Sequence, residues 1–184
     1  MYDDLIIAGF GGQGIMLLGQ MLTYAGLEEG YNVLWIPSYG PEMRGGAANC
    51  TVIFSDDEIG SPIISNPRSL ILMNQPSIDK FEKALQSGGF LLYNVSMVNR
   101  KPTRDDVQIL EIEATTEAYK LGNQRAANMV IMGAFLAVKP LVKLDTIRKL
   151  IEKHFEKKPK LIPLNLKALE RGFELGKKGI KVST

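Results

Sequence analysis

The sequence predicts an α/β protein: a three-layer α/β/α domain with a mostly parallel sheet and a helical C-terminus. Short apolar runs of strand length alternate with helical patterns up to residue 138, and this alternation is typical of a parallel sheet covered by helices. The last third contains two amphipathic helical patterns in succession. A length of 184 residues fits one domain, so residues 1–184 are predicted to form a single unit.

The first elements are a strand, a glycine turn, a helix and a second strand. The run LIIAG (5–9) is short and apolar, which predicts a buried strand. It leads into GFGGQG (9–14), then into a helical pattern over 15–27 that Gly30 ends, and then into VLWI (33–36). This order predicts a β-α-β unit, whose crossover is expected to be right-handed.

Later segments continue the alternation. Strands are predicted at 50–55, 69–74, 88–96 and 107–114, and helices at 77–85, 125–138, 144–156 and 164–178. Ser77 is the expected N-cap of the helix 77–85. The segment 125–138 is apolar almost all round, so we expect it to be buried in the core or under a partner. Asn128 would then need a hydrogen-bond partner, and a subunit interface is one way to supply it.

Composition excludes several classes of protein. The net charge is +2 and the basic residues form no block of like charge, so no nucleic-acid partner is expected. The acidic start differs from a signal peptide, and no run approaches the ~18 apolar residues of a membrane span, so we expect a cytoplasmic protein without membrane association. A single cysteine, Cys50, excludes an intrachain disulfide and a four-cysteine iron–sulfur cluster.

The same composition argues against catalysis by this chain alone. His154 is the only histidine and lies in a basic helical pattern, where a surface position is expected. Cys50 is expected to be a small buried hydrophobe. No catalytic residue and no metal ligand set are therefore predicted.

The glycine turn has the spacing G-x-G-x-x-G and lies between a predicted strand and a predicted helix, as in a Rossmann-like fold. Free N–H groups at the start of that helix would face an anion. The predicted anion-binding residues are Gly9, Gly11, Gly12, Gln13 and Gly14. We expect the Gln13 amide to donate to a ligand or a partner.

Two other interpretations of this turn stay open. A free-standing nucleotide-binding domain could hold NAD, but such a site needs an acid at the end of the second strand, and the nearest acid, Glu42, lies beyond a proline. Alternatively, the glycines only allow close packing of helix against strand.

A second glycine-rich segment, PSYGPEMRGGAANC (37–50), contains Arg44, the only lysine or arginine in the first sixty residues. The residues predicted to contact a ligand or a partner are Tyr39, Gly40, Glu42, Arg44, Gly45 and Gly46. We expect this loop near the glycine turn, at the edge where open α/β sheets bind ligands, with Arg44 making a forked contact to a carboxylate or phosphate. Asn74 and Gln75 end a predicted strand at the same edge, where ligand-binding and turn-forming roles both remain open.

Four motifs together resemble the gamma subunit of the 2-oxoacid:ferredoxin oxidoreductases: GFGGQGI, PSYGPEMRGGAANC, IGSPIISNP and LILMNQPS. The likeness extends over nearly the whole chain. It implies one subunit, not self-sufficient, of an enzyme that oxidatively decarboxylates a 2-oxoacid, transfers the acyl group to coenzyme A and reduces ferredoxin. The segment WIPSYGPEMRGG is more similar to the versions associated with 2-oxoglutarate or branched-chain 2-oxoacids than to those of the pyruvate enzyme.

The resemblance also implies the cofactors and partners. Thiamine diphosphate, magnesium and iron–sulfur clusters are expected in the alpha, beta and ferredoxin-like delta subunits, with coenzyme A as co-substrate and no cofactor bound by this chain alone. Ferredoxin would be reached through the complex. Isolated chains are expected to be able to form homo-oligomers through the helix 125–138 and the loop. A structural module that only closes its partners' active site is a third alternative.

Overall fold

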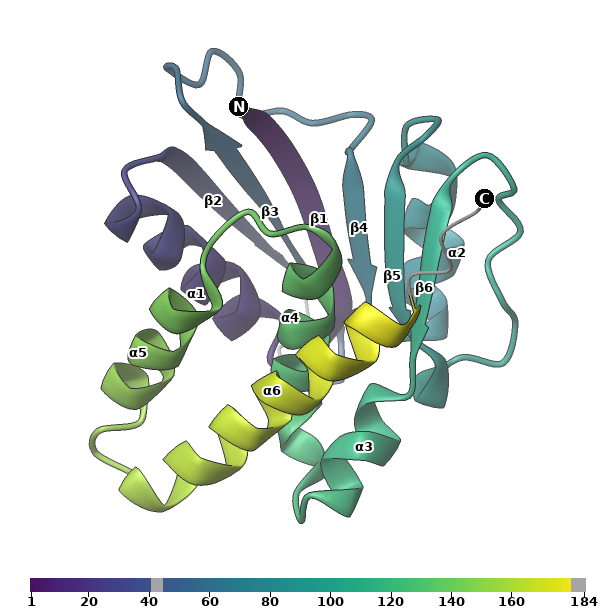
Figure 1. Cartoon of the computed structure of the whole chain (residues 1–184). Helices are drawn as coiled ribbons and strands as arrows, with labels where there is room; N and C mark the ends of the chain where they lie inside the picture. Colours follow the sequence, from purple (N-terminus) through teal and green to yellow (C-terminus); the bar gives the residue numbers. More distant parts are fainter. Residues whose placement is uncertain (41–44, 180–184) are drawn as a thin grey trace.

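The computed structural model describes residues 1–40 and 45–179, so Glu42 and Arg44 of the predicted ligand loop lie outside the described residues. The described strands form a six-stranded sheet in the order β2-β3-β1-β4-β5-β6 (Figure 1). The strands are β1 (Tyr2–Phe10), β2 (Asn32–Tyr39), β3 (Ala47–Ser55), β4 (Ser69–Leu72), β5 (Phe90–Asn94) and β6 (Gln108–Ile112). The helices are α1 (Ile15–Glu28), α2 (Gln75–Phe81), α3 (Ala114–Lys120), α4 (Ala127–Val138), α5 (Leu144–His154) and α6 (Ile162–Gly179), with short 3₁₀ helices η1 (Glu82–Ala84), η2 (Val95–Met97), η3 (Gln124–Ala126) and η4 (Pro159–Leu161).

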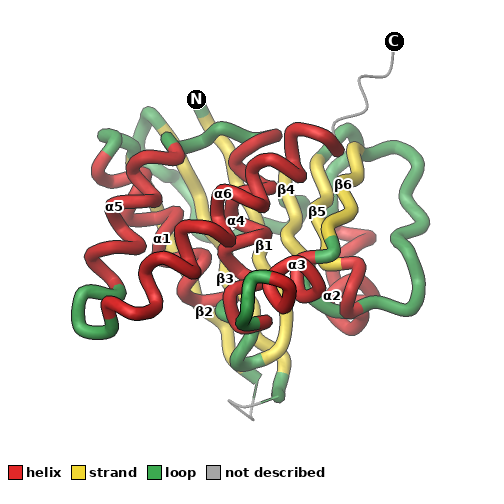
Figure 2. The backbone as a smooth tube through the Cα atoms, turned by 60° about the horizontal axis from the view of Figure 1, so that its bottom comes forward, coloured by secondary structure: helices red, strands yellow, loops and turns green. Residues whose placement is uncertain are grey.

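Helices cover both faces of the sheet, but unequally. Most of them, including α1, α4, α5 and α6, lie on one face, where Figure 2 shows them in front of the strands. The larger apolar core fills the space between these helices and the sheet. On the opposite face α2 and η1 cover a smaller core that includes Ile78 and Leu85. The predicted three-layer α/β/α fold with a mostly parallel sheet and a helical C-terminus is confirmed, since β3 alone among these strands runs against the others.

The predicted β-α-β unit is present, with one strand inserted into it. β1, α1 and β2 follow in order and the two strands run in the same direction, but β3 lies between them and pairs antiparallel with both. The connection from β2 to β3 is too short for a crossover, because parallel neighbours need a dozen or more linking residues. β2 therefore returns as a hairpin, and β1 and β2 are not neighbours in the sheet.

The apolar segment 125–138 forms the buried helix α4. Every side chain from Ala127 to Leu136 is buried, and α6 crosses over the helix (Figure 1). The prediction of a helix buried in the core is confirmed. The expectation that this helix would stay open in an isolated chain is wrong, because α6 covers it, whereas the formation of homo-oligomers stays a prediction. α4 has 12 residues, and no helix within residues 1–40 and 45–179 has the length and hydropathy needed to cross a membrane.

The start of α2 differs from the sequence prediction. Asn74, not Ser77, is the N-cap: its side-chain oxygen accepts hydrogen bonds from the Ser77 backbone N–H at 3.0 Å and the Ser77 hydroxyl at 2.8 Å. The helix begins at Gln75, two residues earlier than predicted. Both residue types are good N-caps, and Asn74 prevails because it precedes Pro76, which suits the first turn of a helix.

Glu117 links α3 to α6 and gives the fold a testable dependence on pH. Its carboxylate accepts hydrogen bonds from Lys120 Nζ at 2.6 Å and Arg171 Nε at 2.7 Å. These bonds lower the pKa of Glu117 below its usual range, with the Lys120 bond contributing most. The unfolded chain therefore binds more protons at low pH, and stability is lost as the pH falls through the folded pKa.

We expect the urea midpoint of the wild type to fall between about pH 5 and pH 3, and that of Glu117→Gln to fall less over the same range. Urea unfolding at three pH values checks this. Parallel curves for the two proteins would show that Glu117 is not coupled to stability in this way.

Candidate functional site

The candidate site lies at the carboxyl ends of the neighbouring strands β1 and β4. After β1 the chain passes through the glycine turn into α1 on one face of the sheet, and after β4 it passes into α2 on the other face. The connections thus leave in opposite directions. Such a switch point is where open α/β sheets bind their ligands.

The glycine turn has two kinds of glycine. Gly12 and Gly14 have φ values of 100° and 75°, which favour glycine, and no atom lies within 4 Å of the place where a Gly12 Cβ would be. At Gly9 a Cβ would lie 2.6 Å from Gln13 Oε1 and 2.8 Å from the Ile15 side chain. The close-packing explanation therefore applies to Gly9, whereas Gly12 leaves space. Gly14 is the N-cap of α1 and has no side chain, so it makes no capping hydrogen bond to the first N–H groups of the helix.

Gln13 is placed differently from the expectation that its amide serves a ligand or a partner. Its side-chain oxygen accepts the Phe10 N–H at 2.6 Å and the Asn74 Nδ2 at 3.1 Å, and its Nε2 donates to the Met73 carbonyl at 3.3 Å. The side chain thus ties the glycine turn to the end of β4. The bonds to Met73 and Asn74 could not be predicted from local sequence, because these partners are 60 and 61 residues away from Gln13.

Within the described part of the 37–50 loop, Gly45 and Gly46 contact the glycine turn. Gly40 N–H donates to the Ala47 carbonyl at 2.8 Å and extends the hairpin, while Tyr39 is 52% exposed. Gly45, with φ 73°, donates to the Gly11 carbonyl at 3.4 Å, and the Gly11 N–H donates to the Gly46 carbonyl at 2.9 Å. The structure therefore brings Gly45 and Gly46 to the glycine turn, whereas Tyr39 and Gly40 continue the β2–β3 hairpin.

A hollow of about 230 Å³ opens beside the turn. Its lining residues are Gly12, Gln13, Met73, Met97, Thr115, Gln124, Arg125 and Ala127. Arg125 is exposed and makes no ion pair with any other residue of 1–40 or 45–179. The sequence pattern places Arg125 at the start of the apolar segment 125–138 and does not identify it as a site residue. A single positive charge directly before an apolar segment is the one local feature that could have indicated such a role.

Asn74 and Gln75 follow β4 and act mainly within the chain. Asn74 is 1% exposed and caps α2 as described above. Gln75 accepts the backbone N–H groups of Asn99 and Arg100 at 3.1 and 2.9 Å, and donates to Asp79 at 2.9 Å. These bonds are structural, and a ligand-binding role for Asn74 and Gln75 stays a prediction.

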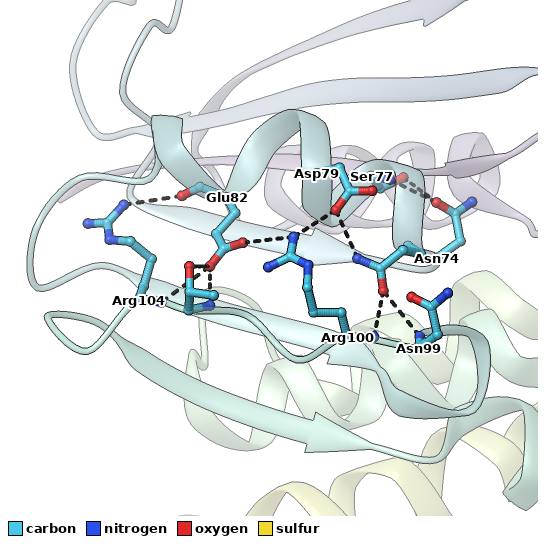
Figure 3. A network of polar contacts seen from close by, with 9 residues as sticks. Asn74, Ser77, Asp79, Glu82, Asn99, Arg100 and Arg104 are labelled. Atoms are coloured by element: carbon cyan, nitrogen blue, oxygen red, sulfur yellow. Dashed lines mark hydrogen bonds and ion pairs between the residues drawn. The ribbon is translucent and has the colours of Figure 1, made fainter.

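These bonds belong to a polar network that holds the connection between β5 and β6 against α2 (Figure 3). Glu82 is 4% exposed and accepts the Thr103 hydroxyl at 2.9 Å and the Arg104 N–H at 3.2 Å, besides the Thr103 N–H. Arg104 in turn donates to the carbonyls of Glu82 and Leu85 at 3.1 and 2.8 Å. The network fixes this long connection near the candidate site.

Glu82→Gln should destabilise the fold by about 1–3 kcal/mol, because several charge-assisted hydrogen bonds to a buried carboxylate are weakened or lost. Asp79→Asn is the matched control. Asp79 belongs to the same network but is 53% exposed, and exposed ion pairs contribute little to stability because water and salt screen them. Chemical denaturation measures both variants. Equal losses would contradict the role assigned to Glu82.

Other predicted features have ordinary structural explanations. Asn128 is 4% exposed and donates to the Gly14 carbonyl at 3.4 Å, so its partner lies within the chain and no subunit interface is needed. Cys50 is fully buried, and burial raises the pKa of its thiol to about 11. His154 is exposed at the end of α5. In the described residues no cluster of three His, Cys, Asp or Glu side chains is placed to hold a metal ion.

The arrangement of strands also weighs against the NAD alternative. β2 is an edge strand, and β3 separates it from β1. The end of β2 therefore does not adjoin the glycine turn, as the second strand of a dinucleotide-binding unit does.

Comparisons with known proteins agree with this geometry. The sequence profile described as "Pyruvate ferredoxin/flavodoxin oxidoreductase" matches residues 4–175. The ketoisovalerate oxidoreductase subunit VorA of Methanothermobacter thermautotrophicus is 38% identical over 95% of this chain, which spans 36% of that protein's length. The 2-oxoglutarate synthase subunit KorC of Methanocaldococcus jannaschii is 33% identical over 96% of this chain and 95% of its own.

A solved structure shows the same fold. The gamma subunit of a keto/oxoacid ferredoxin oxidoreductase from Geobacter sulfurreducens superposes with a TM-score of 0.81 at 29% identity, over 95% of this chain and 98% of the other. The profile match covers most of the chain. The chain therefore belongs to the pyruvate ferredoxin/flavodoxin oxidoreductase family.

Proposed function

We propose that the chain is the gamma subunit of a 2-oxoacid:ferredoxin oxidoreductase, and that the hollow beside the glycine turn takes an anionic group of coenzyme A or of the 2-oxoacid. The near full-length match to KorC supports the subunit role. Identities of 38% to VorA and 33% to KorC, against 31% to the Thermotoga maritima PorC, favour a branched-chain 2-oxoacid or 2-oxoglutarate over pyruvate.

One observation carries the site proposal: Gly12 and Gln13 of the turn line the same hollow as the exposed Arg125. Backbone N–H groups in a glycine turn and a guanidinium both favour a carboxylate or a phosphate. The Gln13 N–H is bonded to the Phe10 carbonyl at 3.1 Å, so Gly12 is the turn residue proposed to offer its N–H here. A hollow of 230 Å³ admits such a group and a short stem, but not a whole coenzyme A molecule. In this proposal the loop residues Tyr39, Gly40, Glu42, Arg44, Gly45 and Gly46 contact the ligand or a partner subunit.

The cofactor chemistry does not fit this chain's own residues. The single cysteine is buried with a raised pKa, and the described residues hold no metal-ligand cluster. We therefore assign thiamine diphosphate, magnesium and the iron–sulfur clusters to alpha, beta and delta partners in the cytoplasm. This chain binds and orients an anion.

Purification of a tagged full chain from its native source tests the subunit role. We expect thiamine-binding and cluster-bearing chains to co-purify, together with reduction of a viologen dye that requires both a 2-oxoacid and coenzyme A. Recovery of the chain alone with bound NAD would contradict the proposal and favour the nucleotide-binding alternative.

Arg44→Lys tests the loop within this proposal. We expect kcat/KM of the assembled enzyme to fall about fivefold to tenfold, because lysine keeps the charge but cannot make a forked contact. Arg68→Lys is a control, since Arg68 lies at the amino end of β4, whereas the site lies at the carboxyl end of that strand. Unchanged turnover and unchanged assembly of the Arg44→Lys enzyme would refute a role for the guanidinium.

A further inference from the structure

We propose that Gln13 and Asn74 form a positioning pair, which sets the distance between the glycine turn and the end of β4 and holds the loop residues Gly45 and Gly46 in place. The effect on turnover rests on the function proposed above. The mechanical coupling does not, because every bond in it lies within this chain.

Gln13 is the centre of the coupling. Its three side-chain hydrogen bonds reach the Phe10 N–H at the end of β1, the Met73 carbonyl beyond β4, and the Asn74 side chain. Gln13 and Met73 are also two of the residues that line the hollow. A change in these bonds therefore changes the spacing between two walls of the hollow.

The two ends of the Asn74 side-chain amide make different hydrogen bonds. The side-chain oxygen accepts from Ser77 and caps α2, whereas Nδ2 donates to Gln13 Oε1. At 1% exposure the amide has little access to water as a substitute partner. This hydrogen bond connects the cap of α2 to the glycine turn, next to the bond from Gln13 Nε2 to the Met73 carbonyl.

The glycine turn in turn holds the loop residues Gly45 and Gly46 in position. Gly11 exchanges two backbone hydrogen bonds with the loop, donating to the Gly46 carbonyl at 2.9 Å and accepting from Gly45 N–H at 3.4 Å. On the other side, Asn128 donates to the Gly14 carbonyl. Ligand-binding groups held this way by supporting side chains are preorganised, so we expect loss of the support to weaken ligand binding.

Two substitutions separate the cap from the coupling. Asn74→Asp and Asn74→Ser both keep an oxygen that can cap α2. The ionised aspartate has no donor for Gln13, and the serine hydroxyl ends about where the Asn74 Cγ lies, one bond short of the Nδ2 that reaches Gln13. The first is nearly isosteric, and the second adds no charge. Asn99→Asp is the control for charge, because the exposed Asn99 lies in the same region and contributes only its backbone N–H to the bonds described.

Amide hydrogen exchange, resolved by NMR on the isolated full chain, is the decisive measurement. In both Asn74 variants we expect the Phe10, Gly11 and Gly45 amides to exchange about tenfold faster, the factor for one net hydrogen bond, with little change in the urea midpoint. Asn99→Asp should leave these rates unchanged. Unchanged exchange in the Asn74 variants, or faster exchange confined to α2, would overturn the coupling.

In the assembled enzyme the same variants should raise KM for one anionic substrate severalfold and leave kcat nearly unchanged. Faster exchange with unaltered kinetics in an active complex would overturn the positioning role. A chain that proves to belong to no such complex would refute the proposed function, but the exchange result would stand on its own.

Discussion

Gly172→Ala should destabilise the protein by about 3 kcal/mol or more, or prevent it from folding, because it forces two helix backbones apart. A Cβ on Gly172 of α6 would overlap the carbonyl group of Val130 in α4, and a Cβ on Gly133 of α4 would overlap the carbonyl of Leu169 in α6. These are backbone atoms, so no side-chain rotation relieves the overlap. The two helices also enclose much of the larger core.

Gly60→Ala is the matched control for this prediction. No atom lies within 4 Å of the place where its Cβ would be, and its φ is not positive. We expect its stability to change by no more than about 0.5 kcal/mol. Urea unfolding of both variants, or yield of folded protein if Gly172→Ala does not accumulate, measures the difference. Similar midpoints for the two variants would contradict the close α4–α6 contact.

Arg125→Gln should lower kcat/KM of the assembled enzyme between about tenfold and 100-fold, since it removes the cation proposed to bind a substrate anion. The loss should appear as a higher KM for either coenzyme A or the 2-oxoacid, and the substrate affected identifies the anion in the hollow. Stability should change little, because Arg125 is exposed and makes no ion pair with the other described residues.

Arg68→Gln is the control for loss of a positive charge. The Arg68 Nε lies 4.0 Å from the Asp4 Oδ2. Arg68 stands at the amino end of β4, and the hollow lies at the carboxyl end of that strand. Its kinetic constants should match the wild type. Normal KM values for both substrates in an assembled Arg125→Gln enzyme would remove the hollow from the proposed function.

The sequence predicts the elements of this fold better than their pairing. The apolar run 69–74 and the helix 125–138 appear where local pattern places them, as β4 and α4, because burial of a continuous apolar segment leaves few alternatives. Pairing depends on distant residues. Nothing in the segments 33–36 and 50–55 alone shows that they form a hairpin or that β3 separates β2 from β1.

The candidate site shows the same division. The glycine turn was predictable because its spacing and its place between strand and helix are local features. Arg125 was not, since it reaches the turn only through the packing of α3, η3 and α4 against the sheet. The bonds of Gln13 also escaped prediction, because an amide in a turn has the same sequence pattern whether it faces a ligand or its own chain.

An anionic substrate in the hollow beside the glycine turn is the central element of the proposed function. Amide exchange of the assembled enzyme, measured with and without saturating coenzyme A and 2-oxoacid, tests this directly. We predict slower exchange in residues 9–14 and 124–128 with one of the two substrates. Unchanged exchange in both segments, in a complex that turns over normally, would contradict it.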